Sequence, residues 1–97
     1  MGLDYAIDEL YATGWTSLDS SSCKHHAGRP YPGIESVTRE FKNAGFDISI
    51  RHIQLFDAYR AEWRDAQGQP RGGVIGKSEA EVAVYALSLM RRQLAPA

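Results

Sequence analysis

The stretch Phe41–Ile50, FKNAGFDISI, contains the change from a helical to a strand pattern on which the fold depends. Apolar residues before its glycine recur at helical spacing: Ile34, Val37, Phe41 and Ala44. If Gly45 takes the left-handed conformation that ends many helices, Phe41 and Phe46 occupy the two contacting positions of a Schellman cap. From Asp47 onward the apolar residues alternate with polar ones. The pattern therefore predicts a helix followed directly by a strand.

Three strands are predicted after this helix. The first begins at Asp47 and extends to Leu55. Its apolar residues Ile53 and Leu55 have the opposite parity to Ile48 and Ile50, which indicates a bulge near Arg51–His52. The second covers Tyr59–Arg64, where apolar and charged residues alternate, and the third is a short segment, Gly73–Lys77. Within the second strand, the alternation predicts that Trp63 faces the final helix together with its apolar neighbours two and four residues earlier.

Two further helices are predicted at the ends of the chain. Residues 3–13 carry apolar side chains at helical spacing, with Gly14 as the stop and Trp15 folded back on the helix end. The last helix runs over 78–94 and begins with a capping box formed by Ser78 and its glutamate three residues later. Between the first two helices, residues 16–33 are rich in serine, glycine and proline without any period, so we expect a long loop.

The expected fold class is α+β, in the order α-α-β-β-β-α. Its three-stranded antiparallel sheet carries helices on one face, as a two-layer sandwich. The length of 97 residues predicts a single domain spanning 1–97, with an αβββα core over 34–94.

The composition excludes several classes of protein. The 11 basic and 12 acidic residues give a net charge of -1, which provides no general attraction to nucleic acid or to an anionic membrane. The single cysteine, Cys23, excludes a disulfide within the chain. The acidic start of the sequence is unlike a secretory signal, and no apolar run is long enough to span a bilayer. We therefore expect a cytoplasmic protein.

The sequence Arg71–Val82, RGGVIGKSEAEV, contains Gly-Lys-Ser and suggests a phosphate-binding loop. Such a loop needs a glycine five residues before Gly76, and that position holds Arg71. It also follows a parallel strand, whereas this chain predicts antiparallel ones. The capping box at Ser78 explains the stretch better.

Residues 34–94 resemble the double-stranded-RNA-binding domain in topology. The most similar segment is GVIGKSEAEVAVYALSLM, which resembles the closing strand and helix of that family. The resemblance implies the same fold and double-stranded RNA as a ligand. However, a pair of lysines follows the serine in that family, and here these positions hold Glu79 and Ala80. We therefore expect the fold without its RNA binding.

Two groups of residues are candidate sites. Arg51, Arg60 and Arg64 are expected to share the outer face of the sheet. With Gln54 and Phe56 they could form a binding surface for a protein or for single-stranded nucleic acid. Glu62 lies between two of these arginines, so the same face also fits a solvated surface with ion pairs across the strands.

The second group lies in the expected loop and consists of Cys23, His25 and His26. These are metal-ligand and nucleophile residue types, but three of them fall short of a closed zinc site. We expect neither metal nor cofactor here, and a mobile loop from Ser20 to Gly28.

The function expected from the sequence is that of a small non-enzymatic interaction domain with a protein partner, and with neither a nucleic-acid nor a membrane partner. The alternative is a nucleic-acid-binding domain of the RNA-binding type. A third hypothesis is an enzyme or a metal site that uses the cysteine–histidine loop.

Overall fold

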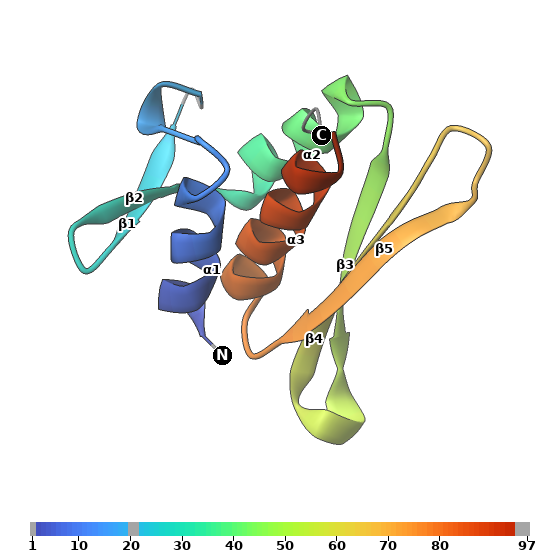
Figure 1. Cartoon of the computed structure of the whole chain (residues 1–97). Coiled ribbons are helices and arrows are strands. Elements are labelled where there is room, and N and C mark those ends of the chain that lie inside the picture. The colour runs from blue at the N-terminus through green and yellow to red at the C-terminus, as the bar shows by residue number, and fades with distance from the viewer. Residues whose placement is uncertain (1, 20–21, 95–97) are drawn as a thin grey trace.

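The structure, a computed structural model, describes residues 2–19 and 22–94 and has an α+β fold (Figure 1). Its helices are α1 (Leu3–Tyr11), α2 (Ile34–Asn43) and α3 (Glu79–Leu94), with short 3-10 turns η1 (Ser17–Asp19) and η2 (Gln54–Phe56). Its strands are β1 (Cys23–His26), β2 (Arg29–Pro32), β3 (Asp47–Ile53), β4 (Ala58–Arg64) and β5 (Pro70–Gly76). The predicted fold class and three-stranded antiparallel sheet are confirmed, and β1 and β2 form an additional two-stranded sheet.

The end of α2 is the Schellman cap expected from the sequence. Gly45 has a φ of 89°, and its amide donates to the Lys42 carbonyl at 3.0 Å. The Phe46 amide donates to the Phe41 carbonyl at 2.9 Å. These two bonds satisfy carbonyls that the helix leaves unpaired, and they direct the chain into β3.

The larger sheet has the strand order β3-β4-β5, and both pairs of strands are antiparallel. β3 and β4 pair without interruption from Asp47 opposite Arg64 to Ile53 opposite Ala58. The bulge expected near Arg51–His52 is therefore wrong. The apolar residues change parity there because Ile53, the last residue of β3, lies on the other face of the strand from Ile48 and Ile50, and the next apolar residue, Leu55, belongs to η2.

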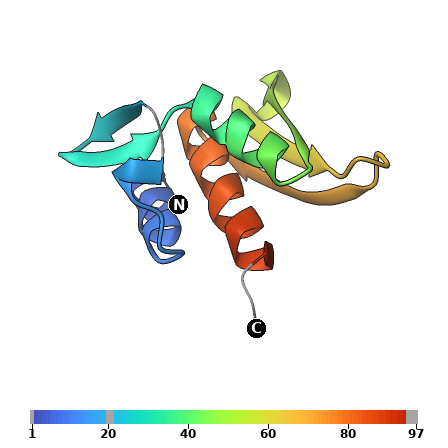
Figure 2. The same cartoon turned by 90° about the horizontal axis from the view of Figure 1, so that it is seen from above.

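The helices form two layers beside this sheet, whereas the sequence predicted one helical layer packed on the sheet. α2 and α3 pack against the sheet, and α1 packs against α3 on the side away from it (Figures 1 and 2). α3 therefore lies in the middle of the molecule. Its sequence fits this position, because Val82, Ala83, Val84, Ala86 and Leu87 are all buried and only a helix enclosed on several sides buries consecutive apolar residues.

Trp63 is the largest side chain in the core. It is 1% exposed, and its ring centroid lies 5.4 Å from that of Phe41. Ala61 is fully buried on the same face of β4 and Tyr59 is half-buried, so the predicted direction of Trp63 is confirmed. On β5, Gly72 pairs with Trp63, and a methyl group on Gly72 would lie 2.2 Å from the indole Cζ2. The indole therefore occupies the place of a side chain on β5.

Residues 16–33 do not form the long loop expected from the sequence. They contain η1 and the hairpin β1–β2, whose two-residue turn is Ala27 and Gly28 with φ values of 52° and 78°. Both values are positive, as in a type I′ turn. Pro30 and Pro32 lie in β2, and counting pairs from the turn puts both at positions that do not hydrogen-bond across the ribbon. The prolines therefore fit a strand here. Ser20 and Ser21 of the expected mobile segment lie outside the described residues.

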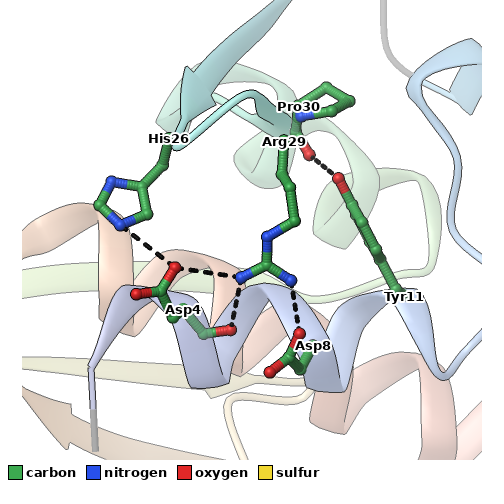
Figure 3. Close-up of polar contacts among 6 residues, drawn as sticks. All are labelled: Asp4, Asp8, Tyr11, His26, Arg29 and Pro30. Carbon is green, nitrogen blue, oxygen red and sulfur yellow. Dashed lines mark hydrogen bonds and ion pairs between the residues drawn. The ribbon is translucent and has the colours of Figure 1, made fainter.

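The hairpin is attached to α1 by polar contacts (Figure 3). Arg29 bridges two carboxylates one helical turn apart, at 2.5 Å from Asp8 Oδ1 and 3.1 Å from Asp4 Oδ1. His26 Nε2 lies 3.3 Å from the same Asp4 oxygen. The Tyr11 hydroxyl donates to the Pro30 carbonyl at 2.5 Å. These contacts explain why a two-stranded ribbon, which is marginal alone, holds its place.

The end of α1 agrees closely with the sequence. α1 ends at Tyr11, two residues before the predicted end, and Gly14 follows with a φ of 90°. Trp15 then folds back and stacks on Tyr11 with a centroid distance of 6.0 Å.

Among the described residues, no helix is long and apolar enough to cross a membrane.

Ser78 caps the start of α3, but the second hydrogen bond of the expected capping box, from the Ser78 amide to the Glu81 side chain, is replaced by a different one. The Glu81 amide donates to Ser78 Oγ at 3.1 Å, as predicted. The Glu81 carboxylate, however, accepts from the Lys77 amide at 3.1 Å and lies under Gly76, where a methyl group would be 2.7 Å from it. Glu81 is 3% exposed, and its hydrogen bond with the Lys77 amide connects the end of β5 to α3.

The contact between Trp63 and Gly72 gives a test of the core. We expect Gly72→Ala to lower the free energy of unfolding by about 1–3 kcal/mol, because the added methyl overpacks the indole. Gly73→Ala is the matched control, since a methyl there meets its nearest atom at 3.4 Å, and it should change stability by about 0.5 kcal/mol or less. Urea unfolding of both variants measures the difference. Equal costs would show that the indole does not lie against Gly72.

Candidate functional site

The outer face of the larger sheet, opposite α2 and α3, is the first feature of the site. The strand register places Arg51, Arg60 and Ile75 in one row across it. The next row toward η2 begins with Ile53 opposite Ala58. This face therefore changes from charged in the middle to apolar near η2.

Two of the arginines form ion pairs with the same carboxylate. Glu62 Oε1 lies 2.9 Å from Arg51 Nη2 and 3.2 Å from Arg60 Nε. The hydrogen bond from Arg51 and the nearby charge of Arg60 hold the pKa of Glu62 below its ordinary value, against the opposing effect of desolvation. The ion pairs across the strands that the sequence allowed are thus present.

Arg64 is separate from this group, so the structure brings together two of the three predicted arginines. It pairs in register with Asp47 at the other end of the face, and its Nη1 lies 3.4 Å from the Gly68 carbonyl in the β4–β5 turn. Asp65 and Arg71 form an ion pair of 2.8 Å at the base of the same turn. The charged side chains at this end of the sheet thus make their contacts within the β4–β5 turn.

The turn between β3 and β4 exposes two large apolar side chains. Leu55 is 84% exposed and Phe56 is 73% exposed. The turn closes at Asp57, a left-handed residue with φ 46° and ψ 50°, whose carboxylate lies 3.0 Å from His52 Nε2. The His52 ring in turn lies 4.9 Å from that of Tyr59. These contacts stabilise the backbone conformation of the turn, from which the Leu55 and Phe56 side chains extend into solvent.

A hollow of about 550 Å³ lies beside this turn. Phe56, Ala58 and Ile75 supply its apolar wall, and Lys77 and Glu81 supply its polar end. Ile75 is itself 53% exposed. We call Leu55, Phe56, Ile75 and this hollow the turn surface.

A second hollow, of about 490 Å³, lies where the C-terminal ends of the three helices meet. Arg91 fills its polar side, donating from Nε to Thr13 Oγ1 at 2.8 Å and from Nη1 to Glu40 Oε1 at 2.9 Å. These bonds join α3 to α2 and to the turn that follows α1, and a cation there complements the negative ends of the helices. The arrangement is explained by stability alone.

The cysteine–histidine group does not form a common site. His26 turns toward α1 and pairs with Asp4, while Cys23 Sγ lies 3.8 Å from the Ser17 carbonyl. His25 points away from His26, because neighbouring residues of a strand face opposite sides. In the described part of the chain, no three histidine, cysteine, aspartate or glutamate residues gather as a metal site.

The start of α3 also lacks the features of a phosphate site. Glu79 is exposed in the first turn, and Lys77 is the nearest basic residue in sequence. Because Glu81 is buried, one exposed carboxylate, rather than two, faces solvent in this first turn.

Comparisons with known proteins add no further evidence: no family model, no curated protein and no solved structure matches the chain.

Sequence reasoning found part of the turn surface. Phe56 was expected beside the arginines, but Leu55 was placed in a strand and Ile75 was not singled out. No local signal separated Leu55 from the strand, because a strand from Asp47 through Leu55 would leave two residues before Ala58, which is enough for a hairpin turn. The exposure of Ile75 depends on its place across from Arg60, which only the register shows.

The shared carboxylate predicts a pH dependence. The lowered pKa of Glu62 means that its contribution to stability is complete above its ordinary value of 4.5 and is lost as the pH falls through the lower value of the folded state. We therefore expect the difference in unfolding free energy between the wild type and Glu62→Gln to be constant above about pH 5 and to shrink below it. Denaturant unfolding over a pH series measures this. A difference that grows on acidification would contradict the ion pairs.

Proposed function

We propose that this chain is a non-enzymatic interaction domain that binds a protein partner through the turn surface. The observation that carries the proposal is that Phe56 and Ile75 are exposed and line one hollow, and that Leu55, next to Phe56 in the turn, is exposed as well. Single exposed apolar residues are ordinary, but apolar residues that line a hollow with a polar end, as Phe56 and Ile75 do, are typical of a protein-binding site.

The energetics support this proposal. Burial of a leucine, isoleucine or phenylalanine side chain yields about 1.5–3 kcal/mol relative to full exposure. These residues do not serve the core of this chain, whose buried cluster excludes all three. Their exposure is thus a cost in the isolated chain that a partner removes.

The rigidity of the turn supports it as well. Asp57 holds a left-handed conformation that costs a residue other than glycine about 1–3 kcal/mol, and the contact with His52 stabilises it. A turn whose backbone is stabilised before binding loses less conformational entropy when a partner binds.

The charges favour a protein partner over a nucleic acid. Arg51 and Arg60 share Glu62, so the face presents less positive charge than its arginines suggest. Phe56 is the aromatic residue of the turn surface, whereas stacking on single strands uses several. Salt-dependent binding to phosphates needs a series of unpaired basic groups.

Photo-crosslinking in cells that make the chain tests this function. With p-benzoylphenylalanine in place of Phe56, we expect a discrete adduct with one protein. The same group in place of Tyr5, an exposed aromatic residue of α1, should not form this adduct. Leu55→Ser together with Ile75→Ser should remove the adduct, whereas Leu18→Ser, at another exposed leucine, should leave it.

Two outcomes would contradict the proposal. One is the absence of any adduct specific to position 56. The other is an adduct that nuclease destroys, which would identify a nucleic acid as the partner in place of a protein.

A further inference from the structure

β5 has one edge that is unpaired in the described part of the chain. The strand hydrogen-bonds to β4 on one side, and it is the last strand of the sheet. Alternate amides and carbonyls of a strand point to each side, so half of those in Pro70–Gly76 point away from β4. Such a row of backbone groups can pair with an added strand.

Part of the edge lacks the devices that usually prevent such pairing. β5 begins with Pro70 and Arg71, but the residues that follow, 72–76 (GGVIG), contain neither proline nor a charged side chain. The opposite edge strand, β3, carries Asp47, Arg51 and His52. A helix contacts each edge strand, α2 at β3 and α3 at β5, so the two edges differ in their side chains, and residues 72–76 of β5 form the uncharged one.

Close packing against buried side chains explains two of the three glycines that leave this edge without side chains. Gly72 makes room for the Trp63 indole, and Gly76 makes room for the Glu81 carboxylate. The third, Gly73, faces outward, and a side chain there would begin 3.4 Å from Arg60 Nη2. The guanidinium of Arg60 thus lies over β5 at Gly73.

The side chains near the edge define what a strand would need. Arg60 is bonded to Glu62 through Nε, and its side chain is 42% exposed, which leaves Nη2 available over Gly73. Ile75 is the next outward residue along β5, and it forms a wall of the hollow at Phe56. Glu62 pairs in register with Gly73 and already balances part of the charge of Arg60. A carboxylate beside Gly73 would therefore be a second acceptor for the same guanidinium, through Nη2, and an apolar side chain beside Ile75 would meet an apolar wall.

We infer that the β5 edge binds an extended segment of a protein partner, which adds a fourth strand to the sheet. This segment carries an aspartate or glutamate two positions from a large aliphatic residue, on the face that meets Arg60 and Ile75. Residues two apart on a strand share one face, which sets this spacing. The inference rests on the proposed function and names the kind of partner.

A random heptapeptide library panned against the full chain tests the inference. We expect the enriched peptides to contain the acidic and aliphatic pair at that spacing. On titration with a selected peptide, the amides of β5 should shift in NMR spectra more than those of β3. Methylation of the peptide nitrogens that face β5 should abolish binding, whereas methylation of the alternate nitrogens should preserve it.

Variants of the protein provide a second readout. Arg60→Gln should weaken a selected peptide about tenfold, as expected for the loss of one charged hydrogen bond. Arg64→Gln is the matched control, because Arg64 lies on the same face and away from the edge at Gly73, and it should change affinity little.

Three outcomes would overturn the inference. If peptides bind and shift Leu55 and Phe56 but not the β5 amides, the turn surface stands and the edge does not. If no peptide is enriched, the edge has no such ligand, and crosslinking at position 56 decides the proposed function separately. If sedimentation shows a concentration-dependent dimer that protects the β5 amides, a second copy of the chain is the occupant.

Discussion

The contact between the Trp63 indole and Gly72 is the constraint on which the rest of the structure depends. Trp63 is the largest fully buried side chain, and it lies between the sheet and the helices, against Phe41. Its Nε1 has no hydrogen-bond acceptor among the described residues, a cost of about 1–3 kcal/mol. The gain from burying the indole must exceed this cost, and close packing over a strand without a side chain provides the space for it.

The outer face follows from this inward direction. With Ala61 and Trp63 turned to the helices, alternation puts Arg60 and Glu62 outside, and the register then sets Ile75 beside Arg60. Gly72 is required by the core, and the same glycine leaves the edge of β5 without a side chain. The interior and the proposed binding surface are therefore two consequences of one pattern along β4 and β5.

The helix and strand periods predicted much of this fold. The boundary at Gly45, the inward face of β4 and the cap at Ser78 all rest on local patterns that a single sequence displays. The hairpin was missed because its turn uses Ala27, which is not a residue favoured at positive φ, and because prolines normally argue against a strand. Its attachment through Arg29 to α1 depends on contacts about 21–25 residues apart in sequence, which no local pattern reveals.

The candidate site was predicted less completely, for a related reason. Arg51 and Arg60 were placed on one face by alternation, but the sharing of Glu62 between them is a matter of distance. The turn surface joins η2 to the end of β5, two segments that come together through the pairing of β4 with β5. The separation of Cys23 from His26 likewise depends on a strand that composition concealed.

The most direct measurement of this account is the NMR relaxation of side chains by a soluble paramagnetic gadolinium chelate. The account predicts strong relaxation of the Leu55 and Ile75 methyl groups and of the Phe56 ring, because all three are exposed. It predicts that the indole of Trp63 and the methyl groups of Val74 are protected, because both are buried. A relaxed Trp63 indole together with protected Leu55, Phe56 and Ile75 would show that the faces of the sheet are reversed, and it would contradict both the core and the proposed surface.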